Sequence, residues 1–148
     1  MKTIVVAYGG SEEASGRALE RAADLAEAFG AELVVASIAP LDQQVIPNPI
    51  VPTESVILPP SAPAADLLDE ADEELGRARE VLARRGLSAE YVTGIGRPAE
   101  AILDIADERQ ASLVVVGSHE SSFLDRILRG SVSEDVSRRA HCDVLIVH

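Results

Sequence analysis

Four short apolar runs, widely separated along the chain, constrain its fold more than any other feature. They span residues 3–7 (TIVVA), 33–38 (LVVASI), 113–116 (LVVV) and 144–147 (VLIV). Runs of this length that are rich in β-branched residues are typical of strands buried on both faces of a parallel sheet. Residues 89–93 (AEYVT) alternate in polarity, which predicts a fifth and less buried strand.

Stretches with apolar residues at helical spacing separate the predicted strands. The first predicted helix follows the N-cap Ser11 and ends at Gly30, and the second spans residues 64–85 before Gly86. The third begins at Pro98, and the fourth runs from the N-cap Ser131 to about Arg139. The residues predicted to face the core are Ala14, Ala18, Leu19, Ala22, Leu25, Ala26, Phe29, Ala64, Leu67, Leu68, Ala71, Leu75, Ala78, Val81, Leu82, Ile102, Leu103, Ile105 and Ala106. Strands that alternate with helices predict a three-layer α/β/α domain with a mainly parallel sheet.

Length and composition are those of one domain with a core of its own. The chain has 148 residues, of which 47% are hydrophobic and 26% are charged. A formal net charge of -12 disfavours nucleic acids and anionic membranes as partners. The apolar run at the start is too short for a signal peptide or a membrane helix, and the single cysteine forms no internal disulfide. We therefore expect a cytoplasmic protein.

Residues 40–63 differ in kind from the rest of the chain, because they hold seven of its 8 prolines. Proline excludes a long helix or a central strand from this stretch. Two interpretations stay open. The loop is either a crossover that covers a sheet edge, or a segment that covers a ligand or contacts a partner.

Two glycine turns directly follow predicted strands, at Gly9-Gly10-Ser11 and at Gly117-Ser118-His119. In doubly wound sheets, ligands bind at the carboxyl ends of the strands where the strand order reverses. If these two strands flank the reversal, their turns form opposite walls of one crevice. The residues Gly130-Ser131-Val132-Ser133 lead into another helix, with Arg126 and Arg129 close by. Helix N-termini, hydroxyls and arginines suit an anion such as a phosphate, although the same turns and caps also occur as ordinary structure.

Several segments resemble the universal stress protein (UspA) family. They are residues 96–102 (GRPAEAI), 111–119 (ASLVVVGSH), 130–134 (GSVSE) and 140–147 (AHCDVLIV), and residues 3–26 fit the family's first strand, loop and helix. The resemblance covers nearly all of the chain except the proline-rich loop, so it implies one such domain over residues 1–148.

Membership of that family would imply a Rossmann-like fold of the adenine nucleotide alpha hydrolase type, with a five-stranded parallel sheet of order 3-2-1-4-5. It would also imply a homodimer formed largely by the last strand. An exposed apolar sheet edge is an aggregation hazard, so pairing it is physically sensible. The residues concerned are Val144, Leu145, Ile146 and Val147.

ATP-binding members of the family hold the phosphates on the pattern G-x-x-G, nine residues, G-[S/T]. By this resemblance, Ala7, Gly9 and Ile38 surround the base, with Gly10 in the same turn, and Val116 and Gly117 lie near the base and ribose. The residues carried over to the phosphates are Gly130, Ser131, Val132 and Ser133, while His119 and Glu120 line the loop.

The sequence departs from the family pattern at two of these positions. Glu120 stands where the second glycine belongs, and Gly9 stands where the family usually has an aspartate that contacts the nucleoside. A carboxylate about 4 Å from a phosphate charge is repelled by roughly 4 kcal/mol at an effective dielectric near 20. Both departures weaken the expected ATP site, unless Mg²⁺ bridges Glu120 to a phosphate.

Two hypotheses for function follow. The favoured one is a cytoplasmic stress-response dimer that acts through contacts with an unknown protein partner and has a degenerate nucleotide site. The alternative is a stress regulator that binds an adenine nucleotide, either ATP or AMP. AMP is penalised less by Glu120 because it carries fewer phosphates.

An enzyme is not expected from this sequence. It has no evident Ser-His-Asp set and no motif with metal-ligand spacing. We expect His119 to be solvated, His141 and His148 to have no catalytic role, and Cys142 to pack as a small residue. The acidic face of residues 66–80 is expected to be solvated surface rather than a calcium site.

Overall fold

Alternating strands and helices make up the chain, as the sequence pattern predicts. The computed structural model describes residues 2–9, 12–40, 64–118 and 132–148. In these ranges the elements are β1 (Thr3–Ala7), α1 (Glu12–Phe29), β2 (Glu32–Pro40), α2 (Ala64–Arg84), β3 (Glu90–Gly96), α3 (Pro98–Glu108), β4 (Leu113–Gly117), α5 (Val132–Arg139) and β5 (Asp143–Val147). None of the helices within these ranges has the length and apolar composition needed to cross a membrane.

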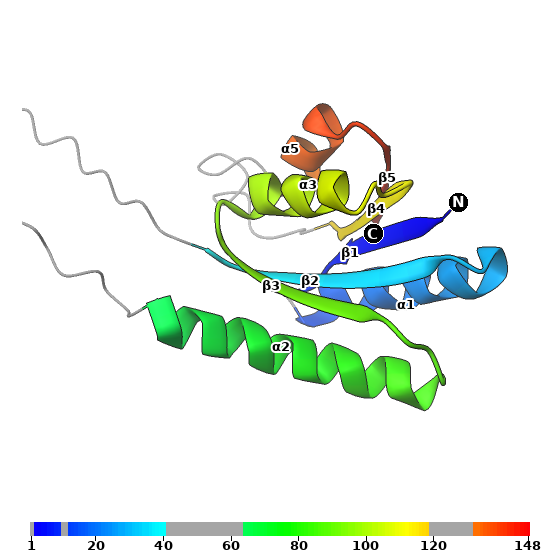
Figure 1. The fold of residues 1–148 in the computed structure, drawn as a ribbon, viewed down its shortest axis with the longest axis horizontal. Helices are drawn as coiled ribbons and strands as arrows, with labels where there is room; N and C mark the ends of the chain where they lie inside the picture. The colour runs from blue at the N-terminus through cyan, green and yellow to red at the C-terminus, as the bar shows by residue number, and fades with distance from the viewer. Residues whose placement is uncertain (1, 10–11, 41–63, 119–131) are drawn as a thin grey trace, which may run out of the picture.

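All five strands join one sheet, in the order β3-β2-β1-β4-β5. Every neighbouring pair is parallel, and β1 lies in the middle, with Val6 beside Val35 of β2 on one side and Val115 of β4 on the other. The strand order reverses between β1 and β4 (Figure 1), which confirms the expected 3-2-1-4-5 topology. The carboxyl ends of these two strands therefore lie next to each other.

Alternate residues of the central strands face two separate cores. Ile4 and Val6 of β1 pack in the core formed with α1 and α2, whereas Val5 packs in the core formed with α3 and α5. All three side chains are completely buried. Among the described helices, α1 and α2 cover one face of the sheet and α3 and α5 cover the other, which gives the expected three-layer α/β/α architecture (Figure 1).

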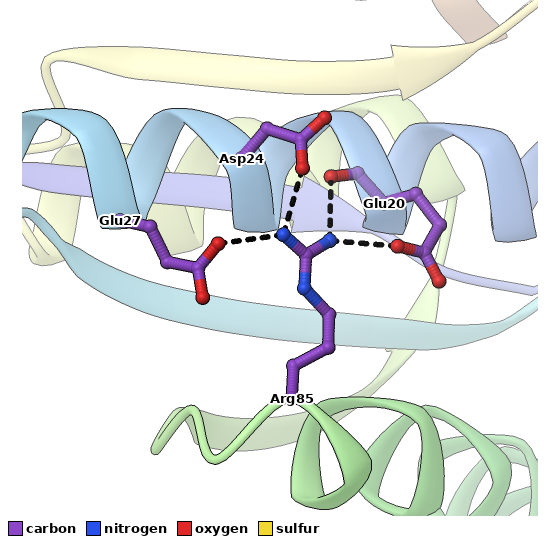
Figure 2. A network of polar contacts seen from close by, with 4 residues as sticks. All are labelled: Glu20, Asp24, Glu27 and Arg85. Atoms are coloured by element: carbon purple, nitrogen blue, oxygen red, sulfur yellow. Dashed lines mark hydrogen bonds and ion pairs between the residues drawn. The ribbon is translucent and has the colours of Figure 1, made fainter.

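Arg85, the first residue after α2, ties that helix to α1 (Figure 2). Its guanidinium donates hydrogen bonds to Glu20 Oε2 at 2.7 Å, to Asp24 Oδ1 at 2.7 Å and to Glu27 Oε2 at 2.6 Å. It also donates to the Glu20 carbonyl oxygen at 3.3 Å. The three acidic residues lie at i, i+4 and i+7 and so share one face of α1, which lets a single cation reach all of them.

The structure extends the ends of two strands by two or three residues beyond the prediction, whereas β4 and β5 each gain one residue. β2 continues to Pro40 rather than ending at Ile38, and β3 continues to Gly96 rather than ending at Thr93. The two strands pair without a break up to Pro40 and Gly96, so backbone pairing sets their ends rather than the side-chain pattern. Of the proline-rich stretch 40–63, only Pro40 falls within the described residues.

Two residues predicted to face the core do not. Phe29 is 59% exposed and Leu68 is 37% exposed. Phe29 is the last residue of α1, beyond Ala26, which is the last buried residue of that helix. Leu68 precedes Ala71, the first buried residue of α2. Both lie on the correct helical face, but at helix ends that extend past the packed part of the core.

Candidate functional site

A cavity of about 170 Å³ lies at the carboxyl ends of β1 and β4, where the strand order reverses. Gly9 and Gly117 both line it, as expected if the two glycine turns converge on one crevice. We call this space the central cavity. Its lining residues are Ala7, Tyr8, Gly9, Ser15, Ala36, Ile38, Pro98, Ile102, Val116, Gly117, Val132 and Ser133.

The central cavity brings together all of the carried-over site residues that the structure describes. These are Ala7, Gly9, Ile38, Val116, Gly117, Val132 and Ser133. Five other predicted site residues lie outside the described residues, namely Gly10, His119, Glu120, Gly130 and Ser131. Contact of any of these residues with a nucleotide stays a prediction.

One side of the central cavity is apolar and is built from three strands and a helix. Ala7, Ala36 and Val116 come from β1, β2 and β4, Ile38 from the end of β2, and Ile102 from α3. Ala36, Val116 and Ile102 are buried, whereas Ala7 and Ile38 are half-buried at the opening. Small side chains at positions 7 and 36 leave room there, which suits a flat apolar ring.

The polar part of the central cavity lies at the beginning of two helices. Ser15 belongs to the first turn and a half of α1, and Val132 and Ser133 begin α5. The first N–H groups of a helix lack intrahelical partners and carry a partial positive charge, so they favour an anion. An apolar slot beside a helix N-terminus can hold a ring system that carries a small anionic group.

Gly117 allows α1 to approach the end of β4 closely. A Cβ atom at this position would lie 2.6 Å from the carbonyl oxygen of Ala14, which is far inside van der Waals contact. Any other residue would therefore push α1 away from the strand. The close approach of α1 to β4 at this wall of the central cavity therefore depends on Gly117.

Gly9 lies against a carboxylate that comes from a distant helix. Its φ angle is +138°, and a Cβ atom here would lie 2.5 Å from Glu74 Oε2. Glu74 is in α2, and its Oε2 accepts a hydrogen bond of 2.7 Å from the Ser37 hydroxyl of β2. Ser37 is completely buried. Glu74 is half-buried, which corrects the expectation that the acidic residues of this helix are all solvated.

A second cavity, of about 130 Å³, adjoins the central one. It is lined by Tyr8, Gly9, Glu12, Ser15, Glu74 and Arg77. Tyr8, Gly9 and Ser15 also line the central cavity. Burial raises the pKa of the Tyr8 phenol; Arg77 opposes this rise, and Glu12 and Glu74 add to it. The phenol is therefore neutral at physiological pH and can donate a hydrogen bond.

Sequence reasoning missed several residues of the two cavities. They are Tyr8, Ser15, Ala36, Pro98 and Ile102 of the central cavity, Glu12, Glu74 and Arg77 of the second cavity, and Ser37, which bonds to Glu74. Ser37 did give a signal, since a hydroxyl within a buried apolar run needs a hydrogen-bond partner. Glu74 directly precedes Leu75, which is buried, and so lies at the border of the helix's apolar stripe. Nothing in the sequence indicates which acidic residue of α2 meets Ser37.

The other chemistry-bearing residues lie away from the central cavity. His141 and Asp107 form an exposed pair with 3.4 Å between Nδ1 and Oδ2. Cys142 packs at the edge of the core under α3 and α5, and burial and nearby Asp107 and Asp143 raise the pKa of its thiol. Within the four described ranges, no three His, Cys, Asp or Glu side chains cluster in a way that could hold a metal ion.

The last strand lies at one edge of the sheet. Within the described part of the chain, β5 pairs only with β4, and its outer edge has no strand beside it. Its four apolar residues, Val144 to Val147, are all half-buried. The predicted use of this strand as a dimer interface remains a prediction.

Comparison with known proteins gives consistent matches along the whole chain. The family model described as "Universal stress protein family" matches residues 1–148. Universal stress protein Rv1636 of Mycobacterium tuberculosis (strain ATCC 25618 / H37Rv) is 37% identical over 147 residues, which are 99% of this chain and 96% of that protein.

Two similar solved structures are nucleotide complexes. One is a universal stress protein in complex with cAMP, with a TM-score of 0.73, 32% identity, and coverage of 99% of this chain and 97% of that one. The other is the universal stress protein from Archaeoglobus fulgidus in complex with dAMP. It has a TM-score of 0.65, 25% identity, and coverage of 100% and 98%.

Proposed function

Since the chain belongs to the universal stress protein family, we propose that it binds an adenine mononucleotide, AMP or cyclic AMP, in the central cavity. We propose further that it does so as a cytoplasmic homodimer in a stress response, and that it does not turn the nucleotide over. The family membership itself confirms the resemblance found in the sequence.

The observation that carries this proposal is the junction of an apolar slot and a helix N-terminus in one cavity. The slot around Ala7, Ala36 and Ile38 offers an apolar surface to the adenine ring. Val132 and Ser133, at the start of α5, offer N–H groups to the phosphate. The cAMP and dAMP complexes of two similar proteins support the same ligand class.

Charge favours a mononucleotide over ATP. The chain carries a formal net charge of -12, and the first turn of α5 holds Glu134 and Asp135. Each further phosphate brings more negative charge toward these carboxylates. At an effective dielectric near 20, one such pair about 4 Å apart costs roughly 4 kcal/mol. ATP therefore needs Mg²⁺ to reach an affinity that AMP reaches alone.

A second candidate function is the one that the sequence favours, a dimer that acts through protein contacts without a nucleotide. The open outer edge of β5 supports this candidate, because an exposed parallel edge strand invites pairing. The same edge supports the proposed homodimer. The two candidates differ in whether the central cavity has a ligand.

Calorimetric titration of the purified protein with AMP, cyclic AMP and ATP separates these candidates. We expect saturable micromolar binding of AMP or cyclic AMP, one per protomer, and weaker binding of ATP without Mg²⁺. The chain has 2 tyrosines and no tryptophan, so quenching of Tyr8 fluorescence gives a second readout. No binding at millimolar concentration of all three ligands overturns the nucleotide proposal and leaves the protein-contact candidate.

Substitutions of two alanines by leucine test where the nucleotide binds. Ala7→Leu fills the apolar slot, so we expect the affinity to fall at least ten-fold. Ala101→Leu enlarges a half-buried alanine of α3 that is not among the cavity-lining residues, and we expect it to leave the affinity within two-fold. Equal effects of the two variants would put the ligand elsewhere. Release of phosphate from the nucleotide above background would contradict binding without turnover.

A further inference from the structure

The carboxylate beside Gly9 lies at the border of the central cavity, not on the outer surface of α2. Glu74 Oε2 occupies the space that a Cβ atom of residue 9 would need, at 2.5 Å, and its Cδ lies 3.3 Å from that point. Gly9 itself lines the central cavity. Glu74 itself lines the second cavity, which shares Gly9 with the central one, so a ligand group that extends past Gly9 meets its carboxylate.

Ser37 holds this carboxylate in a defined orientation. The Ser37 hydroxyl donates a hydrogen bond of 2.7 Å to Glu74 Oε2, and Ser37 is completely buried in β2. A buried hydroxyl on a central strand is a rigid anchor, which reduces the rotamers open to Glu74. A carboxylate has about four acceptor positions, so it can keep Ser37 and accept further donors.

The surroundings determine what kind of group faces Glu74. The second cavity, lined by Glu74, Glu12 and Arg77, shares Tyr8, Gly9 and Ser15 with the central cavity. Arg77 and Glu12 are already an ion pair, with 3.8 Å between Nε and Oε1. Two carboxylates against one guanidinium repel a phosphate. Of the groups of a nucleotide, the uncharged donors of the nucleoside therefore suit this side better than the phosphate does.

From this geometry we propose that Glu74 is a specificity residue for the nucleoside. Its carboxylate accepts a hydrogen bond from the nucleoside part of the ligand, either a sugar hydroxyl or the amino group of the base. This inference rests on the proposed function, because it needs a nucleotide in the central cavity. It assigns to α2 a direct role in selecting the ligand.

Binding of three nucleotides to matched variants tests this role. Calorimetry compares AMP with 2′-deoxy-AMP, which lacks a sugar hydroxyl, and with inosine monophosphate, which lacks the 6-amino group. We expect Glu74→Gln to weaken AMP binding about ten-fold, because the amide is a poorer acceptor. Glu73→Gln, at the exposed neighbouring position, should leave it within two-fold.

The analogues identify which ligand group donates to Glu74, because losing that group and losing the carboxylate should not have additive effects on affinity. The analogue that lacks the donor should bind the wild-type protein about ten-fold more weakly than AMP does. Against Glu74→Gln, that same analogue and AMP should bind equally. If both analogues keep their full penalty on Glu74→Gln, or if Glu74→Gln binds AMP as tightly as the wild type or more tightly, the proposal is overturned.

Two further variants cover the case in which Glu74→Gln does not fold. Ser37→Ala removes the anchor but leaves the carboxylate, so AMP binding should weaken about three-fold or more. Gly9→Ala places a Cβ atom against the carboxylate and should weaken binding further. Wild-type affinity in both variants overturns the proposal. Failure of the wild-type protein to bind any of the three ligands is a different result, because it overturns the proposed function itself.

Discussion

Val132 is the cavity residue at which phosphate binding can be tested most directly. It is the first residue of α5, lines the central cavity and is 39% exposed, so a substitution there disturbs little packing. An acidic residue in the first turn is favourable to the helix but repels a bound phosphate. We expect Val132→Asp to bind AMP about five-fold more weakly than Val132→Asn at low salt, a loss of roughly 1 kcal/mol.

Adenosine serves as the control ligand for this pair, since it has no phosphate. Its affinity should be the same in both variants, and calorimetry in parallel with AMP gives the comparison. Raising the salt concentration should reduce the difference in AMP affinity between the two variants. An equal loss of adenosine binding would mean that residue 132 contacts the nucleoside rather than lying near the phosphate.

At the residue scale, the sequence predicts those cavity residues that belong to local motifs. Val116 and Gly117 follow from a buried strand that ends in a glycine turn. Glu74 could not be predicted in this way, because its position depends on how α2 packs on β2, far away in the sequence. Glu70 and Glu73 of the same helix are exposed, so the acidic pattern assigns Glu74 to the solvent as well.

At the scale of elements, the Arg85 network holds α2 against α1 (Figure 2). The side chain is 23% exposed and its three acidic partners are more exposed, so the interaction is partly screened by solvent. We expect Arg85→Ala to lower the free energy of unfolding by about 1–2 kcal/mol. Arg85→Lys should lower the free energy of unfolding by part of that amount, since an ammonium group cannot reproduce the planar, forked guanidinium.

Arg84→Ala is the matched control, because Arg84 is the adjacent exposed arginine at the end of α2. Urea denaturation should place its midpoint close to that of the wild type. The difference in urea midpoint between the wild type and Arg85→Ala should become smaller at high salt. If the two alanine variants are equally stable, the contacts between Arg85 and α1 contribute nothing measurable.

The pair formed by Arg109 after α3 and Glu90 at the start of β3 predicts a pH dependence. Arg109 Nη2 donates to Glu90 Oε1 at 2.6 Å, and this hydrogen bond lowers the pKa of Glu90 below its ordinary value. A lowered pKa in the folded state stabilises the fold above the ordinary pKa. That stabilisation is lost as the pH falls through the lowered pKa.

Urea midpoints of the wild type and Glu90→Gln, measured between pH 7 and pH 3, test this direction of the pH dependence of stability. The wild type should be the more stable protein at pH 7, with a small difference because Glu90 is half exposed. The difference should disappear in the acidic range, where the carboxyl is protonated in both states. Glu73→Gln is the control, and a gap that grows with acid would contradict the assignment.

The elements themselves follow from the sequence because their signals are local. Apolar runs of β-branched residues predict the strands, and glycine and proline predict where helices end and begin. The ends of β2 and β3 could not be predicted, because pairing between the two strands extends both past the apolar pattern. Phe29 and Leu68 show the same limit for helices, since periodicity gives the face but not how far the core reaches.

At the scale of the whole molecule, the proposed dimer depends on the outer edge of β5. The Val147 carbonyl accepts a hydrogen bond from the Ser118 N–H at 2.7 Å, so the backbone of Val147 faces inward to β4. Backbone groups alternate along a strand, so those of Ile146 face the open edge. We expect Ile146→Pro to convert the dimer to a monomer, because proline has no N–H to donate.

Ile146→Ala removes the same side-chain packing but keeps the N–H, so it should remain dimeric. Sedimentation equilibrium of the two variants and the wild type measures the molecular mass directly. A monomeric wild type would exclude the dimer. A dimeric Ile146→Pro would place the interface on another surface.

The central position of β1 also determines when the protein can first become functional during its synthesis. Ile4 pairs with Leu113, so one edge of β1 has no partner until β4, 109 residues further along, has left the ribosome. Until then the nascent chain exposes an apolar strand edge, which is the kind of surface that chaperones bind. The central cavity needs α5 as well, so no ligand of this cavity can assist folding until α5 has been synthesised.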